Sequence, residues 1–510
     1  MCYPAGVLFL VTLIANTVHA APDEQVGEPP TVEAVVAMIN EYCGSCHGVP
    51  PPNLMPKRSW PNVVQAMADL SAERNGQALI PAEAVRHITA YYYGSAPEAL
   101  PLLPYADGMG ATTRFQTTAV GEESALPMVI DIKAVDLGEH HGKGLLICDA
   151  EANEVRLLQR EGDGWRETVL AEAPVPIRTD VVDFDGDGDP DIIVAALGIL
   201  PPSEELAGKV LLLRQDDAGA FASEVVLEGI GRTTDARAMD VDNDDDPDLV
   251  VAVFGGGTVG GIVWLENTGS DEFVRHDVLG VSGALNATPV DLDADGRLDF
   301  VSLIAQEFEA VVAFMNRGQG SFEQVLLGRA PHPMYGFTGM SLVDLDSDGD
   351  TDVLMSNGDA LDTQPDPKPY HGVQWLENRG KLEFRFHDIG RFYGAAVAAA
   401  GDVDGDGDLD VIAGSWLNFW DDPRRQSLAL FENDGNRGFT QRGVLTRPTG
   451  IVSLALEDVT GDERVDVIAG VLRLDLMMRM MGGDAPQGSE TRMLLLQRAD
   501  VPPGERQPLP

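Results

Sequence analysis

An aspartate-rich loop recurs along most of this 510-residue chain. Its first full copy, residues 183–191, reads DFDGDGDPD, and the first aspartates of the six copies lie 51 to 58 residues apart. An apolar segment precedes each loop and another follows it. A fixed period of this kind marks a repeat architecture, because a unit that cannot bury its own apolar face must stack on its neighbours.

Each copy has the pattern of four short strands. An apolar strand such as 192–196 follows the loop, then a strand that ends in a turn, such as Trp264–Asn267, and then an outer strand opened by an aromatic residue, such as Phe273. Short strands bounded by Gly and Asn turns are typical of a propeller blade. A degenerate copy that starts at Asp136 has lost most of the aspartates, and its presence predicts seven blades.

The last copy contains only three strands and ends near residue 497. The segment 115–120 precedes the first copy and matches the outer strand 322–327 in pattern. We therefore predict that it pairs with the last blade and closes the ring, which leaves only short, protected edges.

The loops also suit a hard cation. Aspartates at the first, third, fifth and ninth positions surround one point with oxygens, the seventh position can add a backbone carbonyl, and glycine at the sixth allows a sharp turn. All-oxygen ligation favours Ca²⁺ over zinc, whereas solvated acidic turns are the alternative. We expect five or six Ca²⁺ ions, and the candidate ligands are Asp183, Asp185, Asp187, Asp189, Asp191, Asp240, Asp242, Asp244, Asp246, Asp248, Asp291, Asp293, Asp295, Arg297 (through its carbonyl), Asp299, Asp344, Asp346, Asp348, Asp350, Asp352, Asp402, Asp404, Asp406, Asp408, Asp410, Asp458, Asp462 and Asp466.

The six loops differ in completeness. In the loop that begins at Asp240, Asp245 stands where glycine is preferred, so its turn costs more. In the last loop Thr460 replaces the third-position aspartate and Glu463 replaces the sixth-position glycine. We predict that the last loop is the weakest site.

These loops explain most of the acidity of the chain. The formal net charge is −47, and 27 of the 82 acidic residues are aspartates at odd loop positions. The remaining 55 acidic residues face 35 basic ones, so more than half of the net charge belongs to the candidate cation sites. A chain this acidic is not expected to bind nucleic acid or an anionic membrane surface.

Residues 113–498 resemble the FG-GAP (VCBS) repeats of integrin-alpha-type seven-bladed β-propellers, through the six loops and their period. The resemblance implies an all-β propeller whose aspartate loops join the first two strands of each blade. It also implies that these loops lie on one face of the disc.

Residues 43–47 read CGSCH. Two thiols three positions apart can attach to the two vinyl groups of one haem, and the following His can bind its iron. The motif therefore indicates one haem c that is covalently attached to Cys43 and Cys46, with His47 as an iron ligand. A haem held by His and a second ligand carries electrons. The alternatives are a redox dithiol or half of a zinc site, but no second cysteine pair completes a zinc site.

The motif lies in residues 25–95, which read as a small all-α domain. We expect helices over 32–40, 60–67 and 81–91, the first capped by Thr31 and the second by Ser59.

This domain resembles the small class I-type c cytochromes, in its helix before C-x-x-C-H, its W-x-x-V-V-x-x-M segment and its final helix. In that family the second iron ligand is usually a Met, and the matching residue here is Met67. Met55, in a loop nearer the attachment site, is the competitor, and His87 is a further alternative. Either methionine can instead be core filler.

The N-terminus predicts export. Apolar residues 6–15 are too few to span a bilayer, and Val18-His19-Ala20 offers a cleavage site, so residues 1–20 read as a signal peptide, with an uncleaved anchor as the alternative. We expect no membrane span in the mature chain and a bacterial-type periplasmic, cell-surface or secreted protein. A Pro-rich linker, 96–112, is expected to join the domains, and 499–510 form a tail.

Two long loops after second strands are expected on the face opposite the aspartates. Binding residues favour such loops on a rigid scaffold, and ordinary loop packing is the alternative. The candidate residues for a protein or carbohydrate ligand are Trp416, Phe419, Trp420, Arg424, Tyr370 and His371.

The sequence thus predicts an exported haem electron-transfer protein whose propeller serves as a scaffold and binding module, with an unknown redox partner protein. A propeller oxidoreductase that passes substrate electrons to the haem is one alternative, although we identify no catalytic constellation in the sequence. An extracellular adhesion module is the other.

Overall fold

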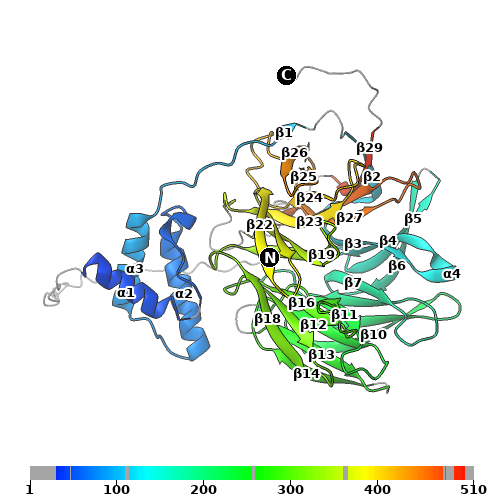
Figure 1. The fold of residues 1–510 in the computed structure, drawn as a ribbon, viewed down its shortest axis with the longest axis horizontal. Helices are drawn as coiled ribbons and strands as arrows, with labels where there is room; N and C mark the ends of the chain where they lie inside the picture. Colours follow the sequence, from blue (N-terminus) through cyan, green and yellow to red (C-terminus); the bar gives the residue numbers. More distant parts are fainter. Residues whose placement is uncertain are drawn as a thin grey trace, which may run out of the picture.

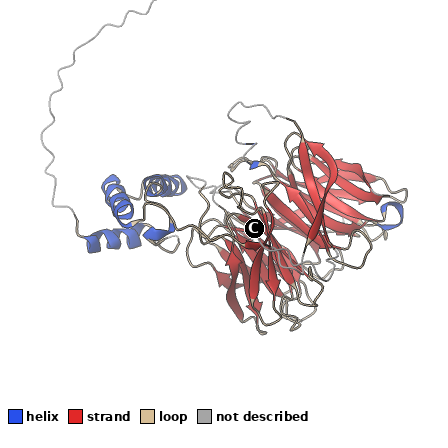
Figure 2. Ribbon diagram, turned by 90° about the horizontal axis from the view of Figure 1, so that it is seen from above, coloured by secondary structure: helices blue, strands red, loops and turns tan. Residues whose placement is uncertain are grey.

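The computed structural model describes residues 30–45, 47–108, 114–162, 164–255, 259–269, 272–359, 366–474, 477 and 488–499. Within them the chain forms a small helical unit beside a large ring of strands (Figures 1 and 2). The predicted signal peptide, Cys46 and nearly all of the predicted C-terminal tail lie outside the described residues.

Three α-helices and a short 3₁₀ turn make the helical unit: α1 (Val32–Tyr42), η1 (Pro52–Leu54), α2 (Trp60–Asn75) and α3 (Ala82–Ser95). The Thr31 hydroxyl caps α1, because it accepts a hydrogen bond from the Ala34 amide at 3.3 Å, as predicted. The prediction that Ser59 caps α2 is wrong. Its backbone is already helical (φ −82°, ψ −30°), and its side chain makes no capping bond.

The core of the helical unit is built around Trp60 and Tyr92, whose rings stack with centroids 4.0 Å apart. The Trp60 indole donates to the Pro52 carbonyl (3.0 Å) and the Tyr92 hydroxyl donates to the Pro50 carbonyl (2.9 Å). Buried aromatic rings with a polar end need such partners. The two bonds fix the loop that follows residue 47 against α2 and α3.

Seven sheets form the ring, and the predicted seven blades are confirmed. The first strands of neighbouring blades contact one another, so they line the centre. From the centre outward the blades are β3 (Val129–Asp136), β4 (Lys143–Asp149), β5 (Glu154–Glu161), β6 (Gly164–Glu172); β7 (Pro176–Val182), β8 (Asp191–Ala196), β9 (Gly208–Gln215), β10 (Phe221–Ile230); β11 (Thr233–Met239), β12 (Asp248–Val253), β13 (Gly261–Asn267), β14 (Phe273–Leu279); β15 (Thr288–Val290), β16 (Asp299–Ile304), β17 (Ala310–Asn316), β18 (Phe322–Arg329); β19 (Phe337–Val343), β20 (Asp352–Asn357), β21 (Gly372–Asn378), β22 (Phe384–Arg391); β23 (Ala395–Gly401), β24 (Asp410–Ser415), β25 (Leu428–Asn433), β26 (Phe439–Leu445); and β27 (Ile451–Glu457), β28 (Asp466–Val471), β29 (Glu490–Arg498), β2 (Phe115–Ser124).

The second strand of each blade is the best-buried element. Every residue of β8, β12, β16, β20, β24 and β28 is buried. Neighbouring blades cover both faces of such a strand, so it reads as a continuous apolar run rather than an alternating one. In the first blade, the short helix α4 (Gly138–His141) replaces the aspartate loop.

Strand β2 closes the ring. It pairs antiparallel with β29, with Phe115 opposite Arg498, and becomes the outer strand of the last blade. The predicted closure is therefore confirmed, and the strand runs beyond residue 120 to Ser124.

Part of the predicted linker is a strand. β1 (Asp107–Gly108) pairs in parallel with β26, where Asp107 lies opposite Arg442 and Gly108 opposite Gly443. It adds a fifth strand to the sixth blade. The tether from the helical unit is thus fixed to the ring just before the first blade begins.

The helical unit contacts the face of the ring that lies opposite the aspartate loops. Arg58 pairs with Asp366 (2.5 Å) and Arg74 with Glu307 (2.7 Å), and both acidic residues lie in loops between second and third strands. Met334, between β18 and β19, packs against the apolar core of the helical unit. Among the described helices, none is long and apolar enough to cross a membrane.

Candidate functional site

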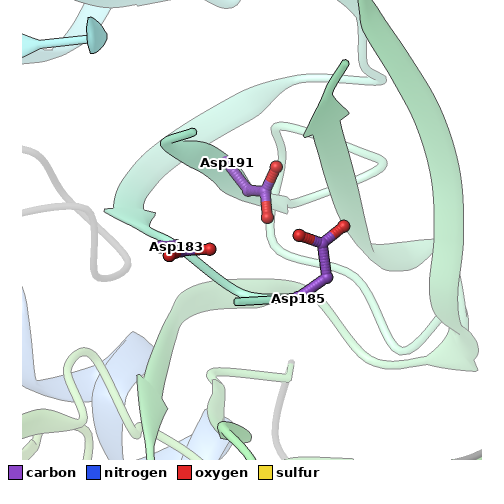
Figure 3. A group of neighbouring side chains, drawn as sticks. All are labelled: Asp183, Asp185 and Asp191. Atoms are coloured by element: carbon purple, nitrogen blue, oxygen red, sulfur yellow. The ribbon is translucent and has the colours of Figure 1, made fainter. Parts of the chain in front are cut away.

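The aspartate loops lie between the first and second strands of their blades, as predicted, and so share one face of the ring. Figure 3 shows the loop after β7, where the carboxylates of Asp183, Asp185 and Asp191 face one another. One oxygen from each lies within 4.8 Å of the other two. Comparable groups are Asp240, Asp242 and Asp248; Asp291, Asp293 and Asp295; and Asp344, Asp346 and Asp348.

The first-position aspartate shapes each loop. Asp183 accepts hydrogen bonds from the amides of Gly186 (2.9 Å) and Gly188 (3.1 Å). Asp344 accepts bonds from the amides of Asp348 (3.1 Å), at the fifth position, and Gly349 (2.9 Å), at the sixth. These bonds hold the chain in a tight curve, so the carboxylates of successive odd positions converge.

The sixth position adopts a left-handed backbone in all six loops, and four of them use glycine there. Asp245 (φ 72°) and Glu463 (φ 65°) adopt the same conformation with a side chain. The left-handed region is disfavoured for residues that carry a Cβ. As the sequence predicts, the turn at Asp245 therefore costs more conformational free energy than a turn with glycine at this position.

The ninth-position aspartate also serves as a structural staple, which sequence reasoning missed. Asp191 is fully buried and accepts hydrogen bonds from the amides of Phe184 (3.0 Å) and Gln215 (2.8 Å). It thereby ties the second loop residue to the end of the third strand. The same pair of bonds recurs at Asp248, Asp299, Asp352 and Asp410.

Burial makes the ninth-position aspartates weaker acids. It raises the pKa of Asp248, Asp352 and Asp410 to about 6, although the backbone amides that bond to them act in the opposite direction. A low-dielectric site disfavours the charged carboxylate. A cation beside these groups would favour the charged form and return their pKa towards the usual range.

Arginines partly neutralise three loops. Third-position aspartates pair with Arg214 at Asp185 (3.3 Å), with Arg317 at Asp293 (3.0 Å), and with Arg437 at Asp346 (2.8 Å). Arg317 and Arg437 lie in the turns between third and fourth strands, far from the loops in sequence. Sequence reasoning missed these pairs because nothing in the loop pattern indicates them.

The C-x-x-C-H motif follows α1. Cys43 takes the C-cap position of that helix and is half-buried against the apolar core, in the same cluster as Met55 and Trp60. Nδ1 of His47 lies 2.8 Å from the Gly48 carbonyl. This contact places the proton on Nδ1 and leaves Nε2 available as a ligand.

The two candidate methionines lie in different environments. Met67, on α2, is 41% exposed, whereas Met55, between η1 and α2, is 4% exposed. Met55 packs in the cluster that also includes Cys43. His87, the further alternative, is paired with Glu83 on the surface of α3 at 3.6 Å.

The six candidate ligand-face residues lie in two loops after second strands, as predicted. The Trp416 indole joins the two loops by donating to the Gly358 carbonyl at 2.9 Å. Tyr370 donates to the Met334 carbonyl (2.9 Å), and His371 is fully buried beside it. These three residues therefore have packing roles.

The loop between β24 and β25, which contains the other candidate residues, contacts the linker. Arg424 is exposed and pairs with Asp422 at 3.0 Å, and Phe419 packs edge-on against Tyr393. Trp420 is half-buried, and its carbonyl accepts a hydrogen bond from Arg447 at 3.0 Å. Arg425, which follows Arg424 and is buried, was not among the candidates.

Comparison with known proteins supports the repeats. Residues 183–251, 240–302 and 291–355 each match the FG-GAP-like repeat. No curated protein matches the chain. The matched ranges overlap and together cover four successive aspartate loops of the ring described above. The chain therefore carries FG-GAP-like repeats, and it folds them into a seven-bladed β-propeller.

Proposed function

We propose that this chain is an exported c-type haem electron-transfer protein, in which a Ca²⁺-binding propeller serves as the scaffold and binding module. The observation that carries the proposal is the C-x-x-C-H motif at the end of α1, beside a buried methionine. The propeller with its repeats is consistent with a scaffold. Export rests on the predicted signal peptide.

The residues around the motif fit a haem. Cys43 and Cys46 would attach it, Nε2 of His47 would bind the iron, and Met55 would supply the second ligand. Met55 is favoured over Met67 because it packs in the same cluster as Cys43, which does not include Met67. Bound in this way, a haem supplies reversible one-electron transfer, and a thioether ligand raises its potential relative to a second His.

The chain itself would control the environment of that group. The Trp60–Tyr92 stack excludes water from the core of the helical unit. Hydrogen bonds from these two rings hold the loop 50–52, which leads to Met55. The Gly48 carbonyl orients His47.

Five or six Ca²⁺ ions are proposed for the aspartate loops. The convergent carboxylates at the loops that begin at Asp183, Asp240, Asp291 and Asp344 support this, since hard oxygen ligands in a tight turn suit this cation. The last loop, which lacks two of the preferred residues, is proposed as the weakest site. Removal of bound ions by a chelator should lower the melting temperature, because a ligand that binds only the folded state stabilises it.

The full chain should be produced in a bacterial host that attaches haem during export. Intact mass should show one covalent haem, and the absorption spectrum should change reversibly on reduction. The Cys43→Ser/Cys46→Ser variant should lose the covalent haem while the propeller stays folded. Folded wild-type protein that carries no haem from such a host would refute the electron-transfer proposal. An unchanged melting temperature in excess chelator would refute the calcium proposal.

A further inference from the structure

A small, partly open pocket lies where the linker crosses the ring. One wall is formed by the linker residues Leu103–Ala106, and the other by the loops 391–393 and 424–426. The described residues that line it include three arginines, Arg391, Arg424 and Arg425, and no aspartate or glutamate. Such a lining is unexpected in a chain with a net charge of −47.

Arg425 is the unusual member of this lining. It is only 6% exposed, and its Nε has no hydrogen-bond partner. Arg391 and Arg424 pair with Asp388 and Asp422, whereas Arg425 makes no ion pair with any residue that the structure describes. An arginine buried to this extent normally pairs with a carboxylate, because an uncompensated buried charge is costly.

The groups around Arg425 orient it but do not neutralise it. Its Nη1 donates to the Leu103 carbonyl at 3.1 Å, and its guanidinium lies 4.5 Å from the Tyr105 ring and 5.1 Å from the Tyr393 ring. Cation–π contacts of this kind offset part of the cost of burial. The Tyr393 hydroxyl accepts a bond from the Leu103 amide (2.8 Å), which leaves its own hydrogen available to donate.

We propose that this pocket binds a small organic carboxylate with a flat apolar body. The carboxylate would pair with Arg425, whose planar fork of donors matches the two oxygens of that group. Tyr105, Phe392 and Tyr393 supply the apolar walls.

Binding would also act on the linker, because Leu103–Ala106 form part of the pocket. A bound carboxylate contacts both the linker and the sixth blade. It should therefore hold the tether of the helical unit more firmly against the ring. This proposal is independent of whether the helical unit holds a haem.

The test uses benzoate as the probe and the full chain, titrated by calorimetry at constant ionic strength. Benzoate should bind saturably, and its neutral isostere benzamide should not. Arg425→Gln should weaken benzoate binding about tenfold or more, because it removes a charged hydrogen-bonding partner. Arg275→Gln is the matched control: Arg275 is exposed and paired with Asp277 on β14 at 2.8 Å, and its variant should bind as the wild type does.

A second variant covers a possible folding defect of Arg425→Gln. Tyr105 is 42% exposed on the linker, so Tyr105→Ala should stay folded and still weaken binding. Benzoate should also slow proteolysis within 96–106 in the wild type. The proposal is overturned if folded wild-type protein does not bind benzoate, if benzamide binds equally well, or if both variants bind like the control. Inorganic phosphate that binds more tightly than benzoate would overturn the assignment to an organic carboxylate.

Discussion

Asp352 shows how one candidate cation ligand also serves the fold. It is fully buried, and its two oxygens accept hydrogen bonds from the amides of Leu345 (3.0 Å) and Asn378 (2.7 Å). A buried amide that loses its acceptor costs more than the bond contributed. The ninth-position aspartates are thus part of the blade core.

Asp352→Ala should lower the free energy of unfolding by about 2–4 kcal/mol, because it leaves two buried amides unpaired. Asp350→Ala, at the exposed seventh position of the same loop, is the control and should change stability far less when calcium is absent. Denaturant unfolding in excess chelator measures both variants. Equal losses would show that the staple has no structural role.

His332 should make the stability of the ring depend on pH. Burial, with Lys368 and Arg391 nearby, lowers its pKa from 6.5 to about 4. Between these values the unfolded chain binds a proton that the folded chain does not. Stability is therefore present above the unfolded pKa and is lost as the pH falls towards 4.

We expect His332→Phe to lose less stability than the wild type between about pH 7 and pH 5, by roughly 1–2 kcal/mol. Calcium should be saturating, because the raised pKa of the buried aspartates acts in the opposite direction in ion-free protein. His276→Phe, at a more exposed position on β14, is the comparison. Parallel pH profiles for the wild type and His332→Phe would contradict this assignment.

At the scale of elements, β2 determines whether the ring is closed. It comes from the start of the propeller sequence and pairs with β29 from its end. Val120, on this strand, is fully buried in a cluster with Met493. Closure thus joins two segments that are more than 360 residues apart.

Val120→Asp should destabilise the propeller by about 4 kcal/mol or more, because it buries an unpaired charge at the closure. Thr118→Asp places the same charge on an exposed position of the same strand and should cost little. Thermal unfolding followed by circular dichroism compares the two. Similar melting temperatures would mean that β2 does not hold the ring together.

The sequence predicts the elements of the propeller well, because the same pattern of strands and loops recurs along the chain. The seven blades, the loops between first and second strands and the closing strand 115–120 all follow from the period. It could not predict the pairing of β1 with β26, because two residues carry no strand pattern. The sequence places Arg425 in a candidate ligand-face loop, but it could not single out this residue, because its burial and its lack of an ion pair among the described residues are properties of the folded surroundings.

At the scale of the whole molecule, the contacts between the helical unit and the ring include two ion pairs and one apolar contact among the residues that the structure describes. Arg58–Asp366 and Arg74–Glu307 lie in partly exposed positions, and Met334 packs against the helical core. Exposed pairs contribute little each, about 0.2–1 kcal/mol, and salt screens them. We therefore expect the contact between the helical unit and the ring to be weak enough to form and break.

The Arg58→Gln/Arg74→Gln variant should therefore keep its melting temperature but gain mobility of the helical unit. Small-angle scattering should show a larger radius of gyration for this variant, and high salt should have the same effect on the wild type. Arg86→Gln, on α3 of the same unit, is the control. An unchanged radius in both experiments would show that the linker alone positions the unit.

The most direct test of the central claim is the absorption spectrum of the purified, oxidised full chain and two methionine variants. The wild type should show a c-type haem with a methionine–iron charge-transfer band. Met55→Ala should lose this band, and Met67→Ala should keep it, because Met55 packs in the cluster that contains Cys43 and Met67 does not. A haem spectrum that loses the band only in Met67→Ala would contradict the proposed ligand, and folded protein without any haem spectrum would contradict the account as a whole.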